Sequence, residues 1–149
     1  MVIGLVGVIG ILIALPVQKR FRDVTERSQY NLLLRREYTL QRTMIVHGVT
    51  THPDYRGGVD YYSIKPSPGA AGPEILERFR IEPGTVLTIA NVLECSNCWF
   101  DDEVTLIVKI PGIRKFDGQT VRLEGVVRND SENRLVLDPQ YFIAAHAEP

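Results

Sequence analysis

The chain has few of the residues from which catalytic and metal sites are usually built. Its three histidines are dispersed, and it has only two cysteines among 149 residues. No Ser, His and Asp arrangement stands out, and the sequence has no glycine-rich loop of the kind that cradles phosphate. Two cysteines alone do not supply the four ligands of a structural zinc site. These absences predict a protein that is not an enzyme and that uses no cofactor.

Its charge is low in total but unevenly distributed. The formal net charge is -1, yet residues 19–42 hold seven Lys or Arg and only three acidic residues. The rest of the chain is therefore acidic and has no basic patch interleaved with aromatic residues. Because such a patch is the usual footprint of a nucleic-acid-binding surface, nucleic acid is not an expected partner.

Charged and hydrogen-bonding side chains are absent from residues 1–15. The apolar stretch continues to residue 17, which is short for a membrane span of about 20 residues but usable in a tilted or thinned bilayer. Its glycines are spaced by three and suit close contact with another helix. We therefore expect a transmembrane anchor over 1–17. The residues that characterise it are Gly4, Gly7, Gly10 and Pro16.

Two other interpretations of the apolar stretch stay open. A secretory signal normally begins with a basic region and ends at a small-residue cleavage site. Here the first basic residue is Lys19, and no Ala-x-Ala pattern precedes it. The second alternative is a helix buried in a protein core.

Residues 18–47 place apolar side chains at helical spacing, which predicts a basic amphipathic helix that continues the anchor. Lys19, Arg20 and Arg22 would then contact lipid headgroups, each contributing roughly 1 kcal/mol. A solvated helix face explains the same residues equally well. The bias of basic residues places the rest of a single-pass membrane protein on the cytoplasmic side.

Residues 48–84 are rich in glycine and proline, with seven of them between Pro53 and Gly72. The pattern predicts a loop-rich connection with one short strand over 59–64 and one helical turn over 73–79. Long loops in small domains often bind partners. A surface excursion without a function is the alternative.

Residues 85–149 alternate apolar and polar side chains in several runs bounded by turn signals. Successive strands of this kind favour a small antiparallel barrel or rolled sheet, because closure removes exposed edges. Residues 118–127 are similar to strands of OB-like barrels. The expected fold class is α+β: a transmembrane helix, an amphipathic helix and an antiparallel β-domain. The expected strands are 85–94, 103–110 and 119–128, followed by a broken strand over 134–137 and 141–144.

Cys95 and Cys98 form the sharpest local motif. Their spacing lets both sulfurs reach one metal ion or pair with each other in a redox loop. His47 and His52 could complete a metal site, with His146 a weaker choice. The motif falls between two predicted strands and not at a helix N-terminus, where a thiolate would be stabilised. A hairpin turn is therefore the favoured interpretation.

Aromatic and acidic residues follow this motif. Trp99 and Phe100 are expected either to cover the core or to anchor a partner. Asp101, Asp102 and Glu103 carry oxygen atoms of the kind that calcium prefers. Consecutive acids on a strand or turn point in different directions, so a solvated turn is favoured over a calcium site.

An apolar stretch ending in Ala14, Leu15 and Pro16 leads into an amphipathic segment and then into a β-rich domain with two cysteines. This arrangement resembles type IV pilins and pseudopilins. The resemblance implies a filament subunit that packs through its N-terminal helix. The chain departs from the family at Leu5, where a glutamate would be needed.

These features together predict a non-catalytic accessory subunit of a larger membrane protein assembly. It would dock through its helix and its β-domain onto other membrane-protein subunits and would contact membrane lipid. Two alternatives stay open. One is a pilin-like filament subunit, and the other is a membrane-tethered module that uses Cys95 and Cys98 for thiol or metal chemistry.

Overall fold

Strands account for most of the regular structure in the computed structural model, which describes residues 19–34, 36–98 and 104–145. The strands are β1 (Phe21–Asp23), β2 (Glu37–Leu40), β3 (Met44–Val49), β4 (Tyr61–Lys65), β5 (Ile75–Ile81), β6 (Val86–Cys95), β7 (Val104–Lys109), β8 (Thr120–Leu123), β9 (Val127–Asn129), β10 (Leu135–Leu137) and β11 (Phe142–Ala144). The helical elements are short: α1 (Asn31–Leu34) and the 3-10 turns η1 (Ser28–Tyr30) and η2 (Arg114–Phe116).

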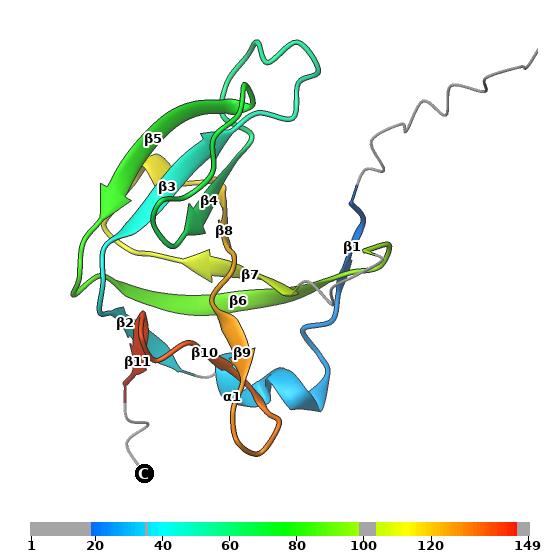
Figure 1. The fold of residues 1–149 in the computed structure, drawn as a ribbon, viewed down its shortest axis with the longest axis vertical. Helices are drawn as coiled ribbons and strands as arrows, with labels where there is room; N and C mark the ends of the chain where they lie inside the picture. Colours follow the sequence, from blue (N-terminus) through cyan, green and yellow to red (C-terminus); the bar gives the residue numbers. More distant parts are fainter. Residues whose placement is uncertain (1–18, 35, 99–103, 146–149) are drawn as a thin grey trace, which may run out of the picture.

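Nine of the described strands form one curled sheet (Figure 1). The strand order is β11-β2-β6-β7-β8-β4-β3-β5, and β1 pairs with a further part of β6. These pairs are antiparallel apart from β4 with β8, which run parallel. The strands β9 and β10 form a separate hairpin. Figure 1 shows β3, β4 and β5 together in the upper part of the view, with β6 and β7 crossing below them.

One apolar core covers one face of this sheet. Successive side chains of a strand point to opposite faces, so each strand contributes alternate residues to the core. On β3, Met44 and Val46 belong to the core, whereas Ile45 and His47 lie on the opposite face, which we call the outer face. Both sets are buried, so β3 is covered on both of its sides.

The predicted amphipathic helix over 18–47 is wrong. The segment folds into β1, η1, the four-residue α1, β2 and part of β3. In β2 the side chains of Tyr38 and Leu40 are buried, and Thr39 between them is more exposed, which is a period of two. The apolar residues of this segment fit both helical and strand spacing. Pairing of β2 with β6 and β11 decides the outcome in favour of strands.

The prediction of a single-pass membrane protein is corrected as well. Across residues 19–34, 36–98 and 104–145, none of the helices has the length and apolar character that a bilayer crossing requires. The helix that was expected to continue the anchor is replaced by short strands and turns. The proposed anchor over 1–17, with Gly4, Gly7, Gly10 and Pro16, lies outside the described residues.

The middle of the chain also differs from the prediction. Residues 48–84 contribute two strands, β4 and β5, to the main sheet. The strand β5 lies where a helical turn was expected over 73–79, because its backbone pairs with β3 along six residue pairs. The sheet is consequently mixed and not purely antiparallel, and it includes strands on both sides of residue 85.

Replacing Leu40 by Ala tests the strand assignment of β2. The Leu40 side chain is 1% exposed, and truncating a buried leucine costs about 2–5 kcal/mol. The Leu32 side chain is 51% exposed, so Leu32→Ala should change the free energy of unfolding by only about 0.5 kcal/mol. Urea denaturation of both variants measures the difference. Equal losses in the two variants would contradict this packing.

Candidate functional site

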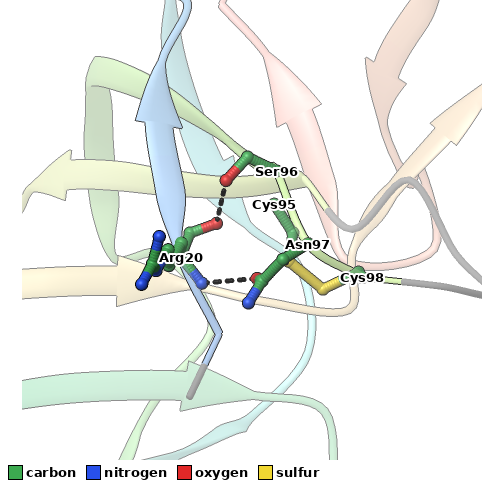
Figure 2. Close-up of a disulfide and its surroundings, with 5 residues drawn as sticks. All are labelled: Arg20, Cys95, Ser96, Asn97 and Cys98. Carbon is green, nitrogen blue, oxygen red and sulfur yellow. Dashed lines mark hydrogen bonds between the residues drawn. A yellow bond between two sulfur atoms is a disulfide. The ribbon is translucent and has the colours of Figure 1, made fainter. Parts of the chain in front are cut away.

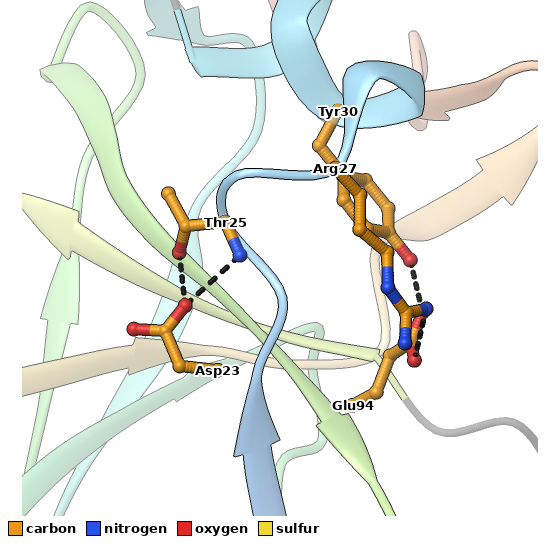
Figure 3. A network of polar contacts seen from close by, with 5 residues as sticks. All are labelled: Asp23, Thr25, Arg27, Tyr30 and Glu94. Atoms are coloured by element: carbon orange, nitrogen blue, oxygen red, sulfur yellow. Dashed lines mark hydrogen bonds and ion pairs between the residues drawn. The ribbon is translucent and has the colours of Figure 1, made fainter.

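A polar network fastens the N-terminal segment to β6 (Figure 3). The Arg27 guanidinium donates to both carboxylate oxygens of Glu94, at 2.8 and 2.7 Å, and the Tyr30 hydroxyl donates to the same carboxylate. Burial, together with the bond to Glu94, raises the pKa of Tyr30. Arg27 is half exposed, and exposed ion pairs contribute little to stability. The network therefore orients η1 against the sheet more than it stabilises the fold.

Asp23 holds the chain in place where it leaves β1 (Figure 3). Its carboxylate accepts hydrogen bonds from the Thr25 hydroxyl and from the Thr25 backbone N–H at 2.9 Å, and these bonds lower the pKa of Asp23. The Thr25 oxygen in turn accepts from the Val92 backbone N–H at 3.0 Å. All of these contacts are local to the β1–β6 junction, which indicates a structural role.

The two cysteines are joined in a disulfide at the end of β6 (Figure 2). The backbone of Arg20 holds the turn between them. Its N–H donates to the side-chain oxygen of Asn97 at 2.7 Å, and its carbonyl accepts from the backbone N–H of Ser96 at 2.8 Å. Both sulfurs are bonded to each other, whereas a metal ion would require thiolates. The motif is thus a hairpin turn that is closed by a disulfide and hydrogen-bonded to the backbone just before β1.

The other predicted site residues are distributed as follows. His47 is buried on β3, and His52 is exposed in the turn that follows β3. Within the described parts of the chain, no three His, Cys, Asp or Glu side chains gather as metal ligands would. Lys19, Arg20 and Arg22 are exposed at β1. Trp99, Phe100, the acidic residues 101–103 and His146 lie outside the described residues.

A row of side chains crosses the outer face at one register, and it was not recognised from the sequence. Arg78 on β5 lies opposite His47 on β3, which lies opposite Ser63 on β4. Ser63 in turn lies opposite Arg122 on β8. We call these four residues the polar row. Ser63 alternates with the core residues Tyr62 and Ile64, and Arg122 alternates with Val121 and Leu123.

His47 is enclosed by the loop between β4 and β5. Its Nε2 accepts the backbone N–H of Ala70 at 3.1 Å. Gly69 has a φ of +80°, and a Cβ at this position would lie 2.5 Å from Cε1 of His47. Burial lowers the pKa of His47, and the charges of Arg78 and Lys65 lower it further, against backbone hydrogen bonds with Ser63 and Ala70 that raise it. The imidazole is therefore neutral near pH 7, with its proton on Nδ1 because Nε2 is an acceptor.

A groove of about 490 Å³ lies between α1, β10 and β11. Its rims carry two of the exposed large apolar side chains, Leu32 and Ile143, at 51% and 55% exposure. The charged residues that line it are three arginines and one aspartate: Arg36, Arg128, Arg134 and Asp130. The remaining lining is largely apolar, including Leu33, Tyr38, Leu135, Val136 and Phe142.

The sequence held a partial signal for the polar row. A polar residue inside an otherwise apolar strand, such as His47 in β3 or Arg122 in β8, must face away from the core side chains beside it. The meeting of these residues depends on the pairing of β3 with β4 and of β4 with β8, and the second pair joins residues about sixty positions apart. No local pattern encodes that distance.

This chain matches no protein-family model, and the curated proteins and solved structures likewise yield no match to it. The resemblance to type IV pilins stays a prediction, which none of these comparisons bears on.

Opening the disulfide should destabilise the protein only slightly. The bond joins residues three positions apart, and closing such a small loop contributes about 2 kcal/mol or less. We expect the double variant Cys95→Ser, Cys98→Ser to lose no more than about 2 kcal/mol in urea denaturation. Wild-type protein with and without a reductant is the control. Global unfolding on reduction would contradict a peripheral staple.

The lowered pKa of His47 makes stability depend on pH. Below the ordinary histidine value of 6.5, the unfolded chain binds a proton that the native chain does not. The free energy of unfolding should therefore be constant above that value and fall as the pH is lowered from 6.5 towards the native pKa. Carboxyl groups with lowered pKa values, such as Asp60 and Glu77, affect stability mainly below their ordinary values of 3.8 and 4.5, which lie below this range.

Urea denaturation between about pH 5 and pH 7.5 measures this dependence. In His47→Gln the decrease should disappear, even if the variant is less stable at every pH. His52→Gln, which removes an exposed histidine, is the matched control and should retain the decrease. A wild-type profile without any slope in this range would contradict a buried neutral His47.

Proposed function

We propose that this protein is a non-catalytic accessory subunit of a larger protein assembly, and that it binds an extended segment of a partner protein in the groove between α1, β10 and β11. The observation that carries the proposal is the exposure of Leu32 and Ile143 on the rims of a largely apolar groove. Contiguous exposed apolar surface on a small domain typically marks a site of protein interaction.

The sheet edge beside the groove favours an extended partner segment. The strand β11 ends the strand order among the described residues, and one of its edges pairs with β2. On the other edge the Phe142 N–H already donates to the Asp138 carbonyl at 3.0 Å, so a further strand would pair there with the backbone of Ala144. In this mode main-chain hydrogen bonds give affinity and pockets for alternate side chains give specificity.

The charges of the groove favour an acidic partner. Three arginines and one aspartate line it. Arg134 is paired with Asp130 at 2.8 Å and with Glu132 at 2.9 Å, and Arg128 lies 3.8 Å from Asp138. Arg36 is the further arginine of the groove, so a segment with alternating apolar and acidic side chains matches the apolar lining and can pair with Arg36.

Photocrosslinking followed by reconstitution tests the proposal. A photoreactive amino acid replaces Ile143 in one version of the full chain and Leu76, an exposed leucine on β5, in the other. In the source cells, position 143 should yield an adduct with one partner protein that position 76 does not give. The partner is then purified, and its binding to the full chain is measured by calorimetry.

Variants of the groove decide the outcome. Leu32→Asp and Ile143→Asp should weaken binding of the purified partner by about tenfold or more, which corresponds to about 1.4 kcal/mol each. The matched control Leu76→Asp should leave the affinity unchanged. Arg36→Glu should weaken binding most at low salt, since it reverses a charge of the groove. Adducts with a second copy of this chain alone, or equal effects of the groove and control variants, would overturn the proposal.

A further inference from the structure

Buried polar atoms without partners gather on the outer face of the sheet. Four buried side-chain atoms have no hydrogen-bond partner among the described residues: His47 Nδ1, Ser63 Oγ, Thr105 Oγ1 and Arg122 Nε. All four residues lie opposite the core, because each alternates with core residues on its strand. An unsatisfied buried polar group costs about 1–3 kcal/mol. Native proteins retain few of them, so their concentration on one face calls for a specific explanation.

Three of the four atoms belong to neighbouring residues of the polar row. Ser63 lies directly between His47 on one side and Arg122 on the other. Adjacent strands are about 4.8 Å apart, so the short serine side chain is flanked by two longer side chains. Thr105 belongs to β7 and lies outside the row.

All three atoms of the row can donate a hydrogen bond. Nε of Arg122 is a donor only, and the Ser63 hydroxyl can donate. Nδ1 of His47 carries the imidazole proton, because Nε2 already accepts from Ala70. Neighbouring donors of this kind are satisfied by an acceptor and repel a metal cation. The complementary ligand is therefore an oxygen-rich acceptor.

The electrostatic environment favours a negative acceptor. Arg122 is held by aromatic rings, with its guanidinium carbon 3.9 Å from the ring centre of Tyr61 and 5.7 Å from that of Phe21. Glu124, the acid closest to it in sequence, is paired with Lys65 at 2.8 Å. The positive charges of Arg78 and Lys65 also act on His47 and lower its pKa after burial, whereas backbone hydrogen bonds with Ser63 and Ala70 raise it.

A hollow beside the polar row is also lined by positively charged side chains. It measures about 320 Å³ and is lined by residues of β3, β5 and the β4–β5 loop, among them Arg78 and Arg80. Its lining residues include no acid. The outer face thus presents arginines on both sides of His47 and Ser63.

We propose that the polar row is an oxyanion-binding site that takes the carboxylate or phosphate group of a small molecule. The guanidinium fork of Arg122 binds the oxyanion, because arginine pairs with two oxygens of such groups at once. Ser63 and His47 donate the further hydrogen bonds. His47 and Ser63 are 1% and 3% exposed, so the group they bind is compact. This site is separate from the groove and does not depend on the proposed partner.

Nuclear magnetic resonance of the full chain tests the site without any substitution. Inorganic phosphate and succinate are titrated separately into protein labelled with nitrogen-15, at constant ionic strength set with chloride. One of the two anions should shift the Arg122 Nε–H and His47 Nδ1–H signals saturably, and which anion does so distinguishes a phosphate ligand from a carboxylate ligand. Shifts that chloride reproduces, or no saturable shift with either anion, would overturn the proposal and leave an ordered water as the partner of these donors.

Two matched substitutions that each remove a hydroxyl group provide a second test of the site. Ser63→Ala removes a buried hydroxyl inside the row, and Thr105→Val removes a buried hydroxyl outside it. Calorimetry with the anion identified above should show affinity at least about tenfold weaker for Ser63→Ala and within about twofold of wild type for Thr105→Val. Equal affinities in the two variants would overturn the assignment of Ser63 to the site.

Discussion

The backbone pairing of β6 is the constraint on which the rest of the sheet depends. One edge of this ten-residue strand pairs with β7, and the other pairs with β2 near its start and with β1 near its end. The register with β7 shifts between Ile89 and Asn91, which bends the strand. Through β2 the strand also fixes β11, so one element joins the N-terminal segment, the C-terminal strand and the disulfide hairpin.

This central strand separates two surfaces of different chemistry. The groove between α1, β10 and β11 is lined by apolar residues together with three arginines and one aspartate. The polar row crosses β5, β3, β4 and β8 and contains three of the four partnerless polar atoms. Two of these three belong to residues that are almost fully buried, His47 and Ser63. A surface of the first kind suits a protein segment, and one of the second kind suits a small charged group. One sheet can carry both because its two ends are built from different strands.

The sequence predicted part of this fold. Alternation over 85–94 and 103–110 corresponds to β6 and β7, where each strand has one core face. The same reasoning failed over 18–47, since Leu33, Leu40 and Met44 fit helical spacing although Leu40 and Met44 belong to strands. The secondary structure of such short segments depends on the strands with which their backbones pair. A local sequence pattern does not predict those partners.

The candidate sites were less predictable than the strands. The cysteine spacing indicated a hairpin turn, and the structure has a disulfide there. The polar row required the register of three strand pairs, one of which, β4 with β8, joins residues about sixty positions apart. Ser63 carries no unusual signal of its own, since a serine in a strand is ordinary. Only its position between His47 and Arg122 makes it notable.

The parallel pairing of β4 with β8 also bears on how the molecule assembles. It closes a loop of about sixty residues, and the entropy of such a closure must be overcome before any contact between the two strands forms. The hairpins β6–β7 and β3–β4 join segments that are close in sequence and can form first. We therefore expect Ser63 and Arg122 to come together only after these hairpins have formed, so their juxtaposition depends on a contact that local structure alone does not provide.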